Sequence, residues 1–327
     1  MKSVVRNYVK PILLKYLFLY KEKFLHAPVP PSELTTHEWG NVSCAPAVIE
    51  EQVPKIIWLY WHQGSMPIIC QQCVKRIKRL NPDFEVNILN SESVHSFLPE
   101  LAPAIVNIKK EDLTLALYSD LIRLMLLEKF GGFWMDISTI LNYELGKLRE
   151  LVLAKQVELL LFAKPANGYT SNSIKSMEYP VTETWFLGAV KGSKFITDWK
   201  NEFLNCLNSP VPSDYYKSDK NYESYVRYLH PSMLEYLLVY ISSQVIMRKN
   251  KQKYKILFMN AHETGFLYAK SCFWNNELTV KLLTSIKKPN KLPLLIKLTN
   301  DTRRISEIAI KNKVYMVDSL MQELVAE

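Results

Sequence analysis

Two neighbouring stretches of this 327-residue chain place charged and polar side chains where they could do chemistry. In 119–123 (SDLIR), the carboxylate of Asp120 and the guanidinium of Arg123 stand three residues apart in an otherwise apolar segment. At helical spacing the two side chains share one face, and burying both charges is costly unless they pair or serve a ligand. These residues alone fit an internal ion pair as well as a ligand site.

The second stretch is 131–138 (GGFWMDIS), in which Asp136 and Ser138 follow a short apolar run. Residues i and i+2 of an extended segment point the same way, and Mg²⁺ or Mn²⁺ takes oxygen ligands from one or two carboxylates plus phosphates. The pattern indicates a cation that offsets charge on a leaving nucleoside diphosphate, with Arg123 holding phosphate and Asp120 accepting sugar hydroxyls. A lone Asp after a strand is more often a turn residue or N-cap.

An α/β domain with a parallel sheet is predicted to position these residues. The pattern favours strands at 55–60 and 84–89, a helix at 68–80 between them, and a buried helix at 113–130 before a strand at 133–135. This order is typical of parallel sheets, which bind ligands beyond the carboxyl ends of their strands. Further elements are expected at 158–162, 184–190, 193–207, 222–247 and 256–259.

The chain is expected to have four parts. Residues 1–27 form a basic amphipathic helix, which suits an anionic membrane surface as well as packing on its own domain. Residues 28–53 are expected to be a proline-containing linker, residues 54–300 the main domain, and residues 301–327 a C-terminal helical tail. No run of 18 uncharged apolar residues occurs, so no transmembrane helix is predicted.

Composition favours a globular protein with an anionic partner. Lysine and arginine number 41 against 32 aspartates and glutamates, giving a net charge of +9 that admits nucleic acid, anionic lipid and nucleotide phosphates. Nine glycines are too few for collagen-like or glycine-linker architectures. Five cysteines with no framework of paired spacings indicate thiols of a cytoplasmic protein.

Three stretches taken together resemble the capsular polysaccharide synthesis proteins. They are 54–64 (PKIIWLYWHQG), 118–123 (YSDLIR) and 131–136 (GGFWMD), with weaker similarity at 183–188 (ETWFLG) and 293–299 (PLLIKLT). Those proteins belong to the sugar transferases with a DxD motif, which include yeast initiating mannosyltransferases and, more distantly, the glucosylating clostridial toxins. The resemblance spans roughly residues 54 to 300, and the ordered pair SDxxR and GGxWxD is its most specific part.

The resemblance implies a GT-A fold, in which a Rossmann-like, mostly parallel sheet flanked by helices binds a nucleotide sugar. It implies a metal-dependent, anomer-retaining hexosyltransferase with a nucleotide diphosphate sugar as donor, a UDP-linked one being the leading expectation. The acceptor would be a repeat unit of a surface or capsular polysaccharide, commonly linked to a lipid. The expected location is the cytoplasm of a bacterium, peripheral to the inner face of its cell membrane.

The resemblance also assigns a donor site. Trp61 matches the aromatic residue that stacks on the nucleotide base, and Gly64 and Ser119 belong to the same matched motifs. Asp120 matches the carboxylate that contacts the donor sugar or ribose. Arg123 matches the guanidinium near the diphosphate, so that both side chains are expected to take part in catalysis.

Asp136 matches the first acid of the DxD motif and is expected to be both catalytic and a ligand of Mn²⁺ or Mg²⁺. Ser138 departs from the motif, because a hydroxyl stands where the wider group has a second Asp. The metal site would therefore bind more weakly or be completed by a C-terminal residue such as His262. Lys297 would close over the diphosphate, and residues 215–216, both tyrosines, would stack on an acceptor sugar.

Two other functions stay open. A non-enzymatic protein that binds a membrane surface or a polyanion would explain the charge, yet leaves Asp120, Arg123 and Asp136 without a role. A degenerate transferase that only binds nucleotide sugar gains a little support from Ser138. Nucleic acid is not expected as a partner, and turnover of a panel of nucleotide sugars would separate the remaining alternatives.

Overall fold

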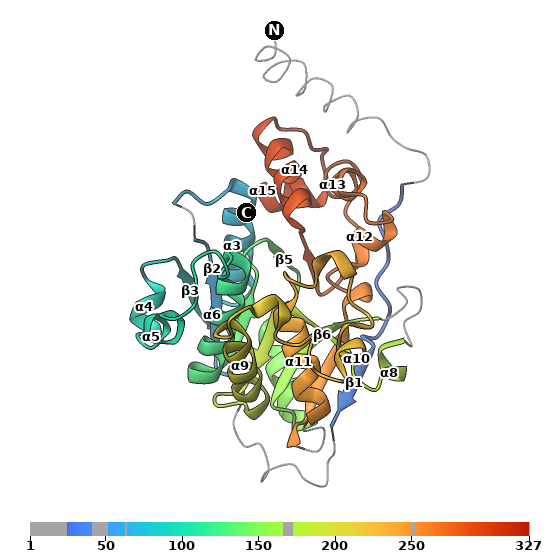
Figure 1. Ribbon diagram of the computed structural model, residues 1–327. Helices are drawn as coiled ribbons and strands as arrows, with labels where there is room; N and C mark the ends of the chain where they lie inside the picture. The colour runs from blue at the N-terminus through green and yellow to red at the C-terminus, as the bar shows by residue number, and fades with distance from the viewer. Residues whose placement is uncertain (1–24, 41–51, 63, 166–172, 250–252, 327) are drawn as a thin grey trace.

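A seven-stranded sheet forms the centre of the molecule (Figure 1). The computed structural model describes residues 25–40, 52–62, 64–165, 173–249 and 253–326. Along the sheet the strands are β1 (Thr36–Trp39), β8 (Ile256–Asn260), β6 (Leu159–Lys164), β7 (Val181–Ala189), β4 (Gly132–Met135), β2 (Ile56–Tyr60) and β3 (Glu85–Leu89). The pairings give β3, β2, β4, β6 and β8 one direction and only β7 and β1 the other. The predicted α/β fold with a mostly parallel sheet is confirmed.

Helices cover both faces of this sheet. The longer ones are α3 (Ile68–Leu80), α6 (Leu115–Phe130), α7 (Leu145–Lys155), α9 (Lys194–Leu207), α11 (Leu238–Lys249), α13 (Asn276–Ser285) and α14 (Asn300–Lys311). The shorter ones are α4 (Val94–Phe97), α5 (Leu101–Ile105), α8 (Ser173–Ser176), α10 (Tyr222–Val226), α12 (Leu267–Ser271) and α15 (Leu320–Ala326). Single 3₁₀ turns occur at η3 (Pro212–Asp214), η4 (Pro231–Met233) and η6 (Ala261–Glu263).

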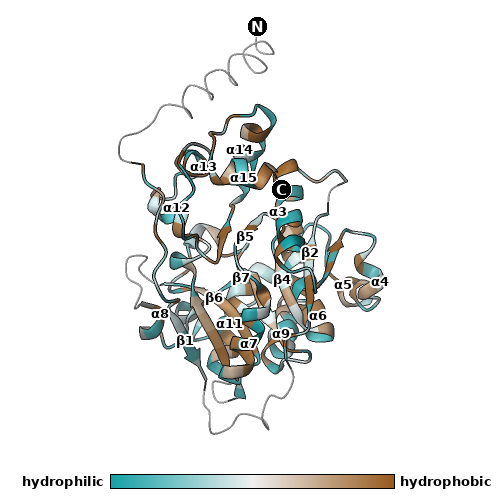
Figure 2. Ribbon diagram, turned by 180° about the vertical axis from the view of Figure 1, so that it is seen from behind, coloured by the Kyte–Doolittle hydropathy of each residue, from teal (hydrophilic) through white to brown (hydrophobic). Residues whose placement is uncertain are grey.

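Two hydrophobic cores lie on opposite faces of the sheet because successive strand residues point to opposite sides. In β2, Ile57 and Leu59 join a core with α3, α7 and the C-terminal helices, whereas Trp58 and Tyr60 join a core with α6, α9 and α11. A sheet covered on both faces needs apolar side chains in both directions. Figure 2 shows this in β6, whose sequence LLLFAK is coloured as hydrophobic over most of its length.

The junction between α6 and β4 sets the position of both motifs found in the sequence. The hydroxyl of Thr114 accepts a hydrogen bond from the backbone N–H of Leu117 and caps the start of α6. At the other end Gly131 and Gly132 adopt φ angles of +66° and +96°, which favour glycine. A Cβ at Gly132 would lie 2.6 Å from the carbonyl oxygen of Ile56, so this tight turn feeds the chain directly into the sheet.

Several elements were not expected, among them α7, α13, β1 and a short ribbon. Residues 36–39, within the segment expected to be a linker, form β1 and pair antiparallel with β8. A separate two-stranded ribbon joins β5 (Thr139–Leu141) to β9 (Leu295–Lys297). In the segment expected as a C-terminal tail, α14 and α15 pack against α3. The helix expected at 1–27 lies outside the described residues as far as residue 24, and no helix within the described ranges is long and apolar enough to cross a bilayer.

Candidate active site

A cleft of about 630 Å³ opens where β2 and β4 end, at the edge of the sheet at which parallel strands present ligand sites. Its volume is within the usual range for small-molecule pockets. Helix α6, strands β4, β7 and β9, and the start of α14 contribute its walls. Among the lining residues are seven that the sequence singles out: Trp61, Ser119, Asp120, Arg123, Asp136, Ser138 and Lys297.

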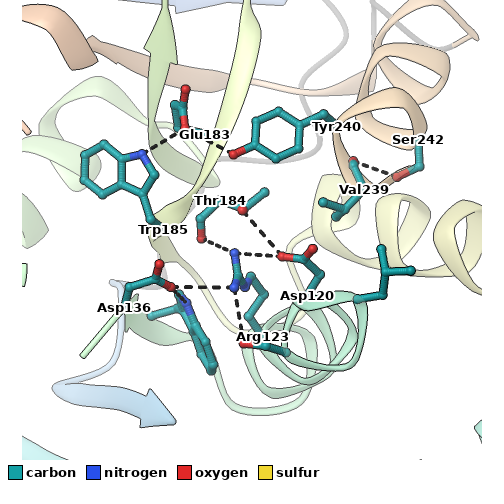
Figure 3. Close-up of polar contacts among 12 residues, drawn as sticks. Asp120, Arg123, Asp136, Glu183, Thr184, Trp185, Val239, Tyr240 and Ser242 are labelled. Carbon is teal, nitrogen blue, oxygen red and sulfur yellow. Dashed lines mark hydrogen bonds and ion pairs between the residues drawn. The ribbon is translucent and has the colours of Figure 1, made fainter. Parts of the chain in front are cut away.

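Arg123 lies at the centre of the polar contacts in the cleft (Figure 3). Its Nη1 is 2.9 Å from Oδ1 of Asp120 and donates to the carbonyl oxygen of Thr184 at 2.8 Å. Its Nη2 donates to the hydroxyl of Ser119 at 3.3 Å and lies 3.6 Å from Oδ1 of Asp136. The guanidinium is also 5.0 Å from the ring centroid of Trp134, which adds a cation–π contact. One buried cation thus ties α6 to β4 and β7.

The two carboxylates beside Arg123 differ in electrostatic environment. Burial raises the pKa of Asp120 to about 6, because loss of hydration outweighs the attraction of Arg123. Burial has the same effect on Asp136, but Lys297 and Arg123 together overcome it and hold the pKa of Asp136 below its usual value. Asp136 is therefore ionised at neutral pH, with cations on two sides.

Lys297 reaches the cleft on the β5–β9 ribbon, in which it pairs with Thr139. Its Nζ donates to Oδ2 of Asp136 at 2.6 Å. Close by, the hydroxyl of Ser138 donates to the carbonyl oxygen of Leu298 at 3.2 Å. The ribbon therefore brings Lys297 and Leu298 against the turn that follows β4.

The oxygen atoms that Asp136 and Ser138 offer at this turn can be compared with the ligands that a divalent cation needs. Nucleotide-bound Mg²⁺ is usually held by one or two carboxylates, and phosphates and water supply the other oxygens. Asp136 supplies one carboxylate, the Ser138 hydroxyl keeps its acceptor lone pairs, and the described residues contain no group of three or more His, Cys, Asp or Glu that could hold a metal alone. These residues fit a cation completed by a diphosphate, and Lys297 would share Asp136 with it.

Trp61 and Gly64 line a second, adjoining pocket of about 340 Å³. This pocket lies at the ends of β2 and β3, and Asn90, Ser91 and Glu92 supply polar atoms to it. The guanidinium of Arg303, on α14, lies 5.0 Å from the centroid of the Trp61 ring. Trp61 therefore forms part of both pockets and is covered by a cation from the C-terminal region.

Other residues singled out from the sequence lie elsewhere. His262 is buried in η6, where its ring meets Trp274 edge-on at 5.6 Å, and it does not line the cleft. The structure therefore does not bring it to Asp136. At 215–216, Tyr216 is buried in the core beside α9 and α11, and neither tyrosine lines the cleft. The sequence did not indicate that Tyr216 belongs to the core, because the residues around this tyrosine pair are polar.

Several cleft residues were missed by sequence reasoning or left without a role, among them Glu183, Tyr236 and Tyr240. Oε2 of Glu183 accepts hydrogen bonds from Nε1 of Trp185 at 2.9 Å and from the hydroxyl of Tyr240 at 3.1 Å (Figure 3). A glutamate inside an apolar strand was a usable signal for Glu183. Tyr240 reaches the cleft on α11 and Tyr236 from the turn that precedes α11, and their local sequence reveals neither placement.

The chain is similar to several known proteins. The O-glycosyltransferase PaGT of Phomopsis amygdali is 26% identical over 195 residues, which are 54% of this chain and 45% of that protein, so the match covers less than half of the relative. The solved structure of the PaToxG glycosyltransferase is 14% identical with a TM-score of 0.35, over 81% of this chain and 87% of that chain. Residues 45–264, about two thirds of the chain, match the model for capsular polysaccharide synthesis proteins, and the chain belongs to that family.

Proposed function

We propose that this protein is a glycosyltransferase, which moves a hexose from a UDP-linked sugar to a hydroxyl group of a growing surface polysaccharide. The observation that carries this proposal is Arg123, held by Asp120 and Thr184 on the cleft side of α6, with Lys297 and Asp136 beside it. Membership of the capsular polysaccharide synthesis family and the printed function of the Phomopsis relative support it.

In this function the chain acts mainly by electrostatics. Transfer breaks the bond between the sugar and the diphosphate, and negative charge builds up on the departing oxygens. Arg123 and Lys297 lie ready to stabilise that charge, and because Arg123 is held by several acceptors it needs little reorganisation during the reaction. Asp120 would accept hydroxyl hydrogens of the donor. The acceptor hydroxyl would attack the sugar carbon on the face that the diphosphate leaves and form the new glycosidic bond, and its proton would pass to the departing diphosphate oxygen. This attack would retain the anomeric configuration without a dedicated nucleophile.

We propose that Mn²⁺ or Mg²⁺ assists, held by Asp136 and Ser138 together with the diphosphate. When bound, the cation would neutralise charge on the leaving group. The lowered pKa of Asp136 supports this role, since the carboxylate is ionised at neutral pH and needs no proton removed before it can act as a ligand.

The pocket at Trp61 suits the nucleotide base. An indole ring offers a flat apolar surface for stacking, and the polar atoms of Asn90, Ser91 and Glu92 lie on the same pocket wall. Because this pocket adjoins the cleft through Trp61, a nucleoside diphosphate can span the two with its phosphates toward Arg123.

We also propose that the protein works at the inner face of the cell membrane on a lipid-linked acceptor. Support comes from the net charge of +9, the basic residues in 1–27 and Phe273, which is 90% exposed at the end of α12 next to Lys270. Sedimentation with vesicles of phosphatidylglycerol and phosphatidylethanolamine tests this separately from the reaction. Binding should fall with Phe273→Ala, and unchanged binding would remove Phe273 from the membrane contact.

The reaction itself is tested by hydrolysis and binding of a panel of nucleotide sugars with Mn²⁺ present. Wild type should select one donor, and Asp136→Ala and Arg123→Ala should each lower turnover by about 100-fold or more. Asp83→Ala, at an exposed ion pair far from the cleft, is the matched control and should keep full turnover. Equal turnover by all four proteins would contradict the assignment of Asp136 and Arg123 to the active site. Binding of polyanions that depends steeply on salt, with no preference for one nucleotide sugar, would favour the non-enzymatic alternative.

A further inference from the structure

Glu183 is a buried carboxyl group that faces the cleft without an ion-pair partner among the described residues. Its side chain lines the cleft, and the whole residue is only 6% exposed. Trp185 and Tyr240 both donate to Oε2, and no described residue donates to Oε1. Burying a carboxyl group is expensive unless its oxygens are bonded. One oxygen of Glu183 is thus held by the protein, and the other remains for a ligand.

The backbone of β7 is irregular where it presents this carboxyl group. Leu161 of β6 pairs with Leu187 of β7, but the next pair is Ala163 with Thr182, so residues 183–186 stand opposite a single residue of β6. Such bulges redirect side chains and are frequent beside active sites. The irregularity places Glu183, Thr184 and Trp185 all in the cleft lining, which regular alternation along a strand would not do.

Large apolar side chains stand exposed at the mouth of the same cleft. Tyr236 is 53% exposed, Met233 is 45% exposed and Leu115 is 56% exposed, and all three line the cleft. Water-exposed apolar side chains gathered at a cleft are typical of a binding surface. The apolar C–H face of a sugar ring can pack on an aromatic ring such as that of Tyr236, and its hydroxyl groups can then reach a carboxyl group.

We propose that Glu183, Tyr236 and Met233 form the acceptor subsite, where Oε1 of Glu183 bonds a hydroxyl group of an uncharged sugar whose ring packs on Tyr236. This proposal rests on the glycosyltransferase function proposed above. A carboxyl group favours a neutral, hydroxyl-bearing ligand over a phosphate. The exposure of Met233 and Tyr236 favours the acceptor over the donor sugar, because a growing chain must extend from the cleft into solvent.

The protonation of Glu183 suits this role. Burial raises the pKa of Glu183 to about 7, against the attraction of Lys164 and Lys297 and the hydrogen bonds from Tyr240 and Trp185. A hydroxyl group both donates and accepts, so either form of the carboxyl group can bond it. Glu183 therefore binds and orients the acceptor, and Arg123 and Lys297 act on the departing diphosphate.

Saturation-transfer NMR with methyl glycosides of glucose, galactose, mannose and N-acetylglucosamine, recorded with and without UDP, tests the subsite. At least one glycoside should bind wild type, and Glu183→Gln and Tyr236→Ala should each weaken it 10-fold or more with UDP affinity unchanged within twofold. Two control variants should bind the glycoside as wild type does. They are Glu158→Gln, a buried glutamate outside the cleft, and Tyr228→Ala, an exposed tyrosine outside it.

Several results would overturn the assignment. These are no glycoside binding to wild type, binding that survives both substitutions, or displacement of the glycoside by the intact nucleotide sugar, which would place it in the donor pocket. Tyr236→Ala, at an exposed position, keeps the test decisive if Glu183→Gln fails to fold. Glycoside binding by a protein that binds no nucleotide sugar would contradict the proposed function, and the same residues would then form a sugar-binding site and not an acceptor subsite.

Discussion

Nζ of Lys297 lies 2.6 Å from Oδ2 of Asp136, although 161 positions separate the two residues in the chain. The contact depends on the β5–β9 ribbon, which is only three residues long on each side. It keeps Asp136 ionised and places a lysine where a diphosphate is expected. The C-terminal region is therefore part of the cleft and not an appendage to it.

Replacing Lys297 by methionine should weaken UDP binding by about 10- to 100-fold, because the proposed diphosphate site would lose one hydrogen-bonded charge. Isothermal titration calorimetry of UDP measures the change. Lys311→Met removes the same charge from an exposed position on α14 and should leave the affinity unchanged. Equal affinities for all three proteins would remove Lys297 from the diphosphate site.

Replacing Arg123 by lysine should lower both stability and activity. A lysine cannot reach Asp120, Thr184 and Asp136 together, since it lacks the planar fork of the guanidinium. We expect a loss of about 2 kcal/mol in the free energy of unfolding and about 100-fold in kcat/KM. Urea unfolding and donor turnover measure these quantities. Arg227→Lys, on the exposed surface, should change neither.

Replacing Ser138 by aspartate should strengthen Mn²⁺ binding in the presence of UDP by about 10-fold, because a second carboxylate then faces the proposed metal position. Electron paramagnetic resonance of free Mn²⁺ measures the affinity. Ser138→Asn serves as the control, because asparagine has nearly the same size as aspartate but carries no charge. If both variants bind Mn²⁺ as wild type does, residue 138 lies outside the coordination sphere.

Replacing Glu183 by glutamine should improve the stability of the protein relative to wild type more at high pH than at low pH. The raised pKa means that the folded state holds its proton more tightly than the unfolded state, so wild type loses stability as pH rises from about 4.5 to about 7. Glutamine does not titrate, so the variant does not share this loss. The unfolding free energy of the variant minus that of wild type should therefore increase by about 3 kcal/mol across that window. Urea unfolding at pH 4.5 and pH 8 measures it, and a difference independent of pH would disprove the prediction.

Replacing Gly132 by alanine should destabilise the protein by about 3 kcal/mol, because the residue has φ of +96° and the new Cβ would lie 2.6 Å from the carbonyl oxygen of Ile56. Gly146→Ala is the matched control, since nothing lies within 4 Å of its Cβ position at the start of α7. It should be neutral or stabilise by about 0.5 kcal/mol. Thermal unfolding of the two variants would contradict the prediction if their midpoints were equal.

The sequence was informative wherever local signals decide the structure. Helix α6 and strand β4 lie close to the predicted ranges because an apolar run, a capping Thr114 and the glycine pair at 131–132 act over a few residues. The β5–β9 ribbon has no such signal, since strands of three residues show no periodicity. Lys297 was therefore expected through resemblance alone. Tyr236 was not expected, because it reaches the cleft from the turn before α11, which has no local signal of its own.

The match to the family model ends at residue 264, whereas Lys297, Leu298, Thr299, Asn300 and Arg303 line the cleft beyond it. The polar cluster of Asp120, Arg123 and Asp136 thus belongs to the part of the chain recognised by the family model, and the wall formed by residues 297–303 does not. This cluster and this wall come from separate segments of the sequence, and they meet only in the folded protein. Exchanging residues 265–327 with those of a relative would replace this wall as one unit, and with it Lys297, which holds Asp136.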